Sequence, residues 1–145
     1  MLPLKRILCP TDFSDAARHA IAAARELALH FGSEVRLVHV LPVVPVVAPN
    51  PNFVLSVPEY ERALHADAQE RLDAMSRELN AAGVHTTTEV GHGDAGSEIV
   101  RMAGGDGVDL IVMATHGQGR VEHFLFGSVA EKVVRRAKIP VLTLR

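Results

Sequence analysis

The residues best placed to do chemistry lie near the end of the chain, between an apolar run and an apolar-periodic helix. The stretch reads DLIVMATHGQGRVEHFLFGSVAEKVV, and its loop holds three glycines, Gly117, Gly119 and Gly127, before Ser128 opens the helix. Glycines let a backbone approach a ligand closely, and a helix N-terminus offers N–H groups with a partial positive charge. This pattern indicates an anion site of the phosphate type, with an ordinary turn as the alternative.

A second glycine motif, GHGDAG at 91–96, has the letters of a dinucleotide-binding fingerprint. That fingerprint also needs an acidic residue about twenty positions later, at the end of the next strand. Here the next predicted strand ends in Met113 and Ala114, and Asp109 stands before it. We therefore favour a structural turn over a dinucleotide site. The sequence contains neither a Walker-type phosphate loop nor the G-x-S-x-G motif of serine hydrolases.

The histidines and the serines at predicted helix starts give weaker signals. The eight histidines are scattered and none has the H-E-x-x-H spacing, so the sequence does not predict a zinc site. His116 is a candidate hydrogen-bond donor to a phosphate, although a solvated loop histidine is the favoured interpretation. Ser14 and Ser128 are both expected as N-caps, which accept a backbone N–H from the first helical turn.

The elements that must position these residues alternate in type. Short runs rich in β-branched residues and Leu are predicted strands, and the longer segments between them have helical period. The strands are expected at 6–10, 34–40, 85–90, 109–114 and 140–145, and the helices at 16–32, 59–82, 96–103 and 128–137. This order predicts an α/β fold: an open, doubly wound, parallel five-stranded sheet of the Rossmann-like kind, with helices on both faces. The ligand crevice is expected at the carboxyl ends of the strands, where the strand order reverses.

Periodicity also predicts the core, and prolines predict a loop. In the first helix the apolar stripe ends at Phe31, before Gly32 as a left-handed cap, and in the long helix it runs from Tyr60 to Leu79. Residues 42–58 contain five prolines, so we expect a long loop there rather than a regular helix or a central strand. Because this loop is apolar, we expect it to pack on its own helices or on a second subunit, with a lid over a pocket as the less favoured alternative.

Length and composition favour one globular domain over residues 1–145. The formal net charge is −2, and acidic and basic residues are interspersed, which argues against nucleic acid or an anionic membrane as a partner. Cys9 is the single cysteine and cannot form a disulfide within the chain. Because the N-terminus has no signal-peptide pattern and no uninterrupted apolar run reaches the length of a spanning helix, we expect a cytoplasmic protein.

Two segments together resemble the universal stress protein family: PTDFS after the first strand and ATHGQGRVEHFLFGSV before the last helix. The nucleotide-binding branch of that family carries G-2x-G-9x-G-[ST]. This chain has Ala114, Gly117, Gly127 and Ser128 at the matching positions. The closing segment VAEKVVRRAKIPVL is also similar, and the resemblance covers the whole chain. It implies an adenine-nucleotide alpha hydrolase-like version of the predicted fold.

The resemblance implies that ATP or a related nucleotide, AMP or ADP, binds at the strand ends, with Mg²⁺ or Mn²⁺ on its phosphates. Asp12 would accept hydrogen bonds from the ribose hydroxyls, and Val40 would contact the base. Backbone N–H groups at 127–129 and the Ser128 hydroxyl would bind the phosphates. The full candidate set is Pro10, Thr11, Asp12, Val40, Met113, Ala114, His116, Gly117, Gly127, Ser128 and Val129. The resemblance also implies a homodimer, paired through the edge strand 140–145.

One residue departs from the family pattern. Ala114 stands where the first glycine of the motif is expected. If that position needs a positive φ, alanine strains the loop by about 1 kcal/mol, whereas the change is harmless if the residue ends an extended strand. We favour the harmless case, with a reduced nucleotide affinity left open.

The leading functional hypothesis is a stress-response regulator that binds ATP rather than turning it over efficiently. Slow hydrolysis would be secondary, with Asp12 or His116 as the evident general bases in these loops. A second hypothesis is a dimeric interaction module with a vestigial pocket, which uses residues 42–58 as the surface for an unidentified protein partner. An adenylyl-transferring enzyme ranks last, because the sequence lacks the H-I-G-H and S-G-G-x-D-S signatures.

Overall fold

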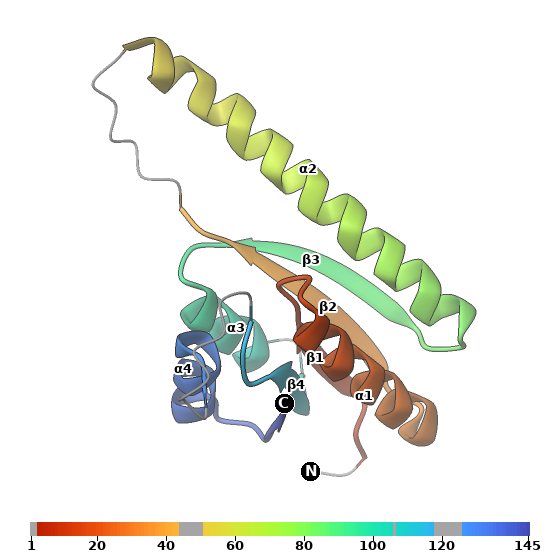
Figure 1. The fold of residues 1–145 in the computed structure, drawn as a ribbon. Coiled ribbons are helices and arrows are strands. Elements are labelled where there is room, and N and C mark those ends of the chain that lie inside the picture. Colours follow the sequence, from red (N-terminus) through yellow and green to blue (C-terminus); the bar gives the residue numbers. More distant parts are fainter. Residues whose placement is uncertain (1–2, 44–50, 106, 118–125) are drawn as a thin grey trace.

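The structure is a computed structural model of the chain that describes residues 3–43, 51–105, 107–117 and 126–145, and of residues 51–56 the backbone alone. The elements of the described part follow the predicted order (Figure 1). They are β1 (Arg6–Pro10), α1 (Asp15–Phe31), β2 (Glu34–Leu41), α2 (Pro51–Ala81), β3 (Thr86–His92), α3 (Ala95–Gly104), β4 (Leu110–Ala114), α4 (Ser128–Arg136) and β5 (Val141–Leu144). Apart from the start of α2, no bound differs from its predicted position by more than two residues.

The strands form one parallel sheet in the order β3-β2-β1-β4-β5, which confirms the predicted open, doubly wound α/β fold. β1 lies at the centre, where Ile7 pairs with Val35 of β2 and with Leu110 of β4. The chain first builds outward to β2 and β3, and it then returns to add β4 and β5 on the other side of β1. The strand order therefore reverses between β1 and β4, so the loops that follow these two strands border the crevice.

Helices cover both faces of the sheet, and each face has its own hydrophobic core. Neighbouring residues point to opposite faces: Ile7 and Leu37 belong to one buried cluster, while Leu8 and Val38 belong to the other. α1 and α2 complete the first cluster, and α3 and α4 complete the second (Figure 1). The central strands β1 and β4 are buried on both sides because parallel sheets carry their crossover helices on both faces, whereas the edge strands β3 and β5 are partly exposed.

The helix ends test the predicted caps. Ser14 caps α1 as expected, since its hydroxyl accepts the backbone N–H of Ala17 at 3.2 Å. Gly32 ends the same helix with φ 68°, in the left-handed conformation that glycine adopts without strain. The prediction for Ser128 is wrong: the cap of α4 is Gly127, and Ser128 is the first residue of the helix.

The predicted loop at 42–58 is wrong in its second half, because α2 begins at Pro51 and contains Pro58. Proline at a first helical position is well tolerated, since its missing N–H would have no helical partner there. Pro58 does remove one helical hydrogen bond, but Val57 beside it is buried and holds this part of the helix against the molecule. Residues 44–50 of the predicted loop lie outside the described residues.

Two members of the predicted apolar stripes are not core residues. Tyr60 is 57% exposed and Phe31 is 43% exposed, whereas Ala68 and Leu72 are buried as predicted. The exposure of Tyr60 reflects the outward side of α2, because Val57, one turn earlier on the same helix, is buried. Among the described residues, no helix is both long and apolar enough to cross a membrane.

Candidate functional site

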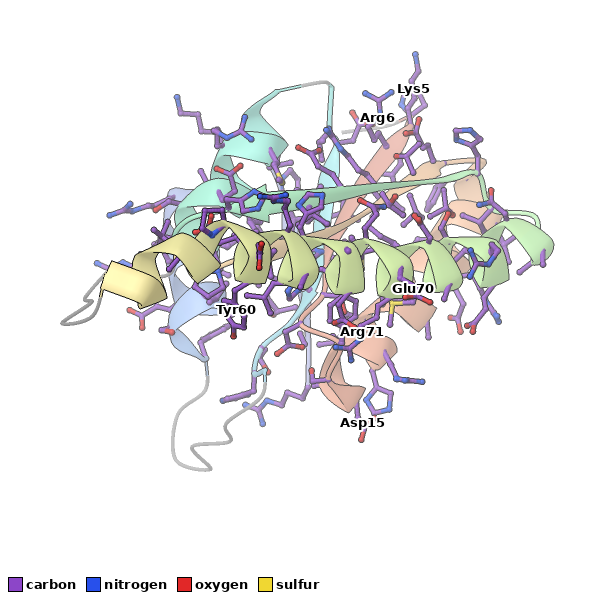
Figure 2. All side chains as sticks on the ribbon, turned by 90° about the horizontal axis from the view of Figure 1, so that it is seen from above. Lys5, Arg6, Asp15, Tyr60, Glu70 and Arg71 are labelled. Carbon is purple, nitrogen blue, oxygen red and sulfur yellow. The ribbon has the colours of Figure 1, made fainter. Side chains whose placement is uncertain are left out.

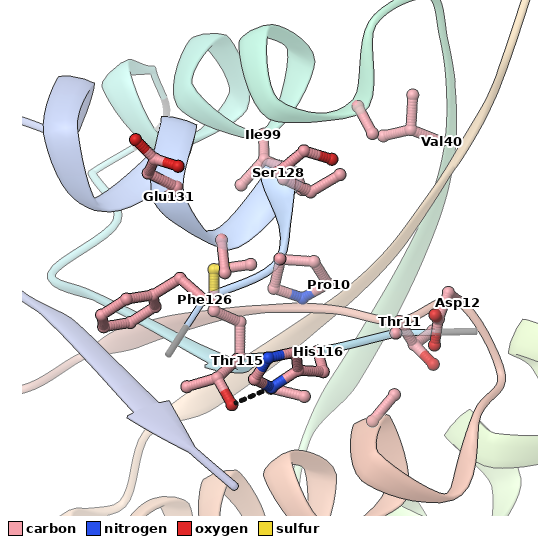
Figure 3. A pocket seen from close by; sticks show the side chains of 18 of the residues that line it. Pro10, Thr11, Asp12, Val40, Ile99, Thr115, His116, Phe126, Ser128 and Glu131 are labelled. Carbon is pink, nitrogen blue, oxygen red and sulfur yellow. Dashed lines mark hydrogen bonds between the residues drawn. The ribbon is translucent and has the colours of Figure 1, made fainter. Parts of the chain in front are cut away.

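A cavity of about 540 Å³ opens at the carboxyl ends of β1, β2 and β4, beside the start of α4. Figure 3 shows Asp12, His116 and Ser128, which come from three segments far apart in the sequence, around this cavity. The structure brings the whole predicted set together here. The lining includes Pro10, Thr11, Asp12, Val40, Met113, Ala114, His116, Gly117, Gly127, Ser128 and Val129.

The β1–α1 loop, residues 11–14, is held by hydrogen bonds of its own side chains. The hydroxyl of Thr11 accepts the N–H of Phe13 at 3.0 Å, and a carboxylate oxygen of Asp12 accepts the N–H of Ser14 at 3.0 Å. The N–H of Thr11 donates to the carbonyl of Val38 in β2 at 2.8 Å. Local bonds of this kind are typical of Asx and Ser/Thr turns, and they place the Asp12 carboxylate at the cavity wall.

Gly117 is needed for space rather than for its backbone conformation. A Cβ atom at this position would lie 2.1 Å from Oδ2 of Asp12, which is far inside van der Waals contact. Gly117 is not among the described residues that have a positive φ. The glycine therefore lets the β1–α1 loop and the segment after β4 approach each other, with the carboxylate of Asp12 between them.

The start of α4 presents backbone donors to the cavity. The N–H of Gly127 donates to the carbonyl of Thr115 at 2.7 Å, and the first bond within the helix runs from the N–H of Glu131 to the carbonyl of Gly127 at 2.9 Å. The N–H groups of residues 128–130 precede that first bond, and a helix start carries a partial positive charge. Ser128 and Val129 line the cavity, so this charge is directed at it.

The two residues that the sequence left open now have defined environments. Ala114 is the last residue of β4, pairs with Leu144 of β5, and is not among the described residues with positive φ. The expectation that it ends a strand without strain is confirmed. His116 is half-buried, and its Nδ1 lies 2.9 Å from the hydroxyl of Thr115 (Figure 3). Its role as a phosphate donor stays a prediction.

Sequence reasoning missed about half of the cavity wall. The sequence pattern could have identified His39 and Thr115, because both are polar residues at the end of predicted strands. The α3 residues could not be identified in this way, because their apolar spacing is the same as that of any helix packed on a core. The lining residues missed are Ala17, Val38, His39, Ala95, Ile99, Thr115, Phe126, Ala130 and Glu131.

The GHGDAG motif is a turn in which Gly93 serves the backbone conformation and Gly96 serves packing. Gly93 has φ 120°, and Gly96 allows the side chain of Lys132 to lie so close that a Cβ would come within 2.7 Å of it. The Nζ of Lys132 then reaches Asp94 at 2.5 Å, which joins the start of α3 to α4. The hydrogen bond from Lys132 is the main reason why the pKa of Asp94 lies below its usual value. The favoured structural interpretation of this motif agrees with the geometry.

Cys9 lies directly before the site but cannot act as a nucleophile. It is fully buried in β1, and this burial raises the pKa of its thiol to about 12. At neutral pH the thiol is therefore protonated, whereas the reactive form of cysteine is the thiolate. Cys9 acts as a small core residue.

Comparisons with known proteins agree with this architecture. The chain matches the Universal stress protein family over residues 3–145. It is 38% identical to Universal stress protein MJ0531 of Methanocaldococcus jannaschii, over 97% of this chain and 82% of that protein. The solved structure of MJ0577, from the same organism, superposes with a TM-score of 0.81 at 30% identity, covering 97% of this chain and 95% of the other.

Other solved structures share the fold. UspA from Lactobacillus plantarum has a TM-score of 0.85 at 26% identity, with 98% of both chains covered. Two further structures at 22% identity and a TM-score of 0.68 are a universal stress protein in complex with cAMP and one from Archaeoglobus fulgidus in complex with dAMP, and at this identity they show the fold alone. The match over nearly the whole length, together with the sheet order and the relatives, shows that the chain belongs to the universal stress protein family.

Proposed function

We propose that this protein is a stress-response regulator that binds ATP or a related adenine nucleotide in the cavity between β1 and β4. One observation carries the proposal: the start of α4 and the Asp12 carboxylate border one cavity at the point where the strand order reverses. Open α/β sheets bind their ligands at that point, and a helix start is a natural partner for a phosphate.

The chemistry of the wall fits the parts of a nucleotide. Val40, Ile99 and Met113 give an apolar region for the base, and the carboxylate of Asp12 is an acceptor for a ribose hydroxyl. Ser128 and Val129 bring backbone N–H groups for the phosphates, whereas the N–H of Gly127 is already bonded to the carbonyl of Thr115. The volume of about 540 Å³ lies within the range of small-molecule sites. Support also comes from the fold neighbours in complex with cAMP and dAMP, since both ligands are adenine nucleotides.

Any Mg²⁺ or Mn²⁺ at this site would come with the phosphates. Among the described residues, no group of three or more His, Cys, Asp or Glu side chains is arranged to hold a metal ion. Magnesium in nucleotide sites takes its ligands from substrate phosphates, water and one or two carboxylates, a role open here to Asp12. We propose binding rather than efficient turnover, with Asp12 and His116 as the groups to test if hydrolysis is measured.

Native mass spectrometry and titration calorimetry test the proposal. We expect one adenine nucleotide per chain, with GTP bound more weakly than ATP because the base contacts the apolar wall. Asp12→Asn keeps the size of the side chain and removes its charge, and we expect it to weaken adenosine and ATP alike. A protein that binds neither ATP, ADP nor AMP at millimolar concentration would refute the proposal and favour the interaction-module hypothesis.

We further propose that the protein forms a homodimer through β5. This strand lies at the edge of the sheet, and Leu142 on it is 40% exposed. An apolar edge strand tends to pair with another chain unless it is protected. Light scattering should give twice the chain mass, and Leu142→Lys should shift the protein to monomer. A monomer at all concentrations of the unmodified protein would contradict this.

A further inference from the structure

Phe13, in the loop that carries Asp12, has an unusual backbone. Its φ is 65°, and among the described residues it is the only non-glycine with a positive φ. A bulky L-residue in the left-handed region is strained, and such a conformation persists only where the surroundings hold it. The two neighbours of Phe13, Asp12 and Ser14, are joined by a hydrogen bond across it. The contacts that fix Phe13 therefore also help to fix the position of the Asp12 carboxylate.

Two side chains from outside the loop contact the ring of Phe13. The guanidinium carbon of Arg71, in α2, lies 4.1 Å from the ring centroid, within the range of a cation–π interaction. The ring of His39, in β2, lies 4.6 Å away, centroid to centroid, with an angle of 35° between the planes. Figure 2 shows Arg71 on the same side of α2 as Asp15, the first residue of α1. The ring is thus held from α2 and β2 together.

His39 continues this contact to the cavity. Its Nδ1 donates a hydrogen bond to the carbonyl of Thr11 at 2.8 Å, because a carbonyl can only accept. His39, Thr11 and Asp12 all line the cavity, whereas Arg71 does not. The contacts therefore form a continuous path from α2 to the cavity wall: Arg71 to Phe13, Phe13 to His39, and His39 to Thr11.

We propose that Arg71 is a positioning residue for the site between β1 and β4. Its guanidinium holds the Phe13 ring, the ring holds the backbone of the β1–α1 loop in its left-handed turn, and the turn places Thr11 and Asp12 against the ligand. The inference rests on the proposed nucleotide function. In this proposal α2, which lies outside the cavity, influences the ligand affinity of the site. Any shift of α2 relative to the sheet should therefore change that affinity.

The test compares Arg71→Met with Arg71→Lys and with Arg77→Met. Methionine keeps a long apolar chain without the charge, lysine restores a cation for the ring, and Arg77 is an exposed position on the same helix with the same charge. Affinity is measured by calorimetry for ATP and for adenosine. Adenosine carries no phosphate, so a general loss of positive charge does not weaken its binding, while a displaced loop does.

We expect Arg71→Met to weaken both ligands about two- to fivefold, which corresponds to one cation–π contact. Arg71→Lys should recover most of the affinity, and Arg77→Met should behave as the unmodified protein for adenosine. In a Phe13→Leu background, Arg71→Met should have no additional effect, because the ring that it acts through is gone. Amide exchange of the ligand-free Arg71→Met protein should rise at residues 11–17.

Several results would overturn the inference. One is unchanged affinity in Arg71→Met for both ligands, even with a lowered melting temperature, because Arg71 would then only stabilise the fold. Another is a loss for ATP that is absent for adenosine, which would be a charge effect. If the unmodified protein binds no nucleotide, the proposed function fails instead, and amide exchange in the ligand-free protein still decides whether Arg71 holds the loop.

Discussion

The β1–α1 loop and the β4–α4 segment border the same cavity, but they reach it with opposite kinds of residue. In the first, Phe13 takes a left-handed backbone with a large side chain that is gripped by Arg71 and His39. In the second, Gly117 and Gly127 have ordinary backbones, and what matters is the atom they lack. The glycines, which could adopt unusual backbone conformations, are thus needed because they lack a side chain. The strained backbone conformation belongs instead to Phe13, a bulky residue.

Because of this difference, we expect the two sides of the cavity to respond to different substitutions. The β4–α4 side depends on empty volume, so an added group there should act on the ligand while the fold stays intact. The β1–α1 side depends on contacts with α2 and β2, so a removed group there should act on the stability of the fold and on the site together.

Gly127→Glu should abolish nucleotide binding. It places a carboxylate at the helix start that is expected to bind phosphate, and such like-charge contacts cost several kcal/mol, or about two orders of magnitude in affinity. Because a Cβ here lies 3.3 Å from the carbonyl of Thr115, the added bulk needs its own control. Gly127→Gln has the same shape without the charge and should retain much more affinity in calorimetry. Equal losses in the two variants would mean that the phosphate site is assigned wrongly.

Gly117→Ala should weaken binding by about tenfold, the equivalent of one displaced charged hydrogen bond, with little change in the melting temperature. The new Cβ would meet the carboxylate of Asp12, which can rotate away and thereby leaves its position at the cavity wall. In an Asp12→Ala background the same substitution should have almost no further effect on affinity. An additional loss there would show that Gly117 acts on the ligand directly.

Phe13→Gly and Phe13→Ala isolate the strain on the other side. Both remove the ring, but only glycine takes φ 65° without a Cβ clash. We expect the glycine variant to be more stable than the alanine variant by about 0.5–1 kcal/mol, the reverse of the usual order. Urea denaturation measures the difference. A more stable alanine variant would contradict the left-handed backbone of Phe13, and with it the proposal that Arg71 holds a strained turn.

We expect acid to lower the stability of the fold through Asp109, which lies beside the start of β1. Its carboxylate accepts the backbone N–H groups of Lys5 and Arg6 at 2.7 and 2.9 Å, and these bonds hold its pKa below the usual value. A lowered folded-state pKa stabilises the protein above the unfolded-state value of about 3.9, and this contribution is lost as the pH falls through the folded-state pKa. We expect less than about 1 kcal/mol, because the group is partly exposed. Asp109→Asn should flatten the change in urea midpoint between pH 7 and pH 3, and an unchanged slope would exclude this role.

Much of the fold follows from local signals that the sequence carries openly. The alternation of short apolar strands with periodic helices predicts the sheet, and Ser14 and Gly32 mark the ends of α1 because capping depends only on neighbouring residues. Ala114 is predicted as a strand end for the same reason. The candidate set gathers because the carboxyl ends of parallel strands meet at one edge of the sheet.

The order of the elements, the fold and the edge of the sheet at which the site lies all follow from patterns in the sequence. Other features emerge only in three dimensions: α2 begins at Pro51 and runs through Pro58, Tyr60 is exposed, and Arg71 lies against Phe13. The physical reason is range. Caps, turns and periodicity depend on residues a few positions apart, whereas these features depend on how the helices settle on the sheet, where burial and contact outweigh the local preference of proline or of a bulky side chain for its usual backbone.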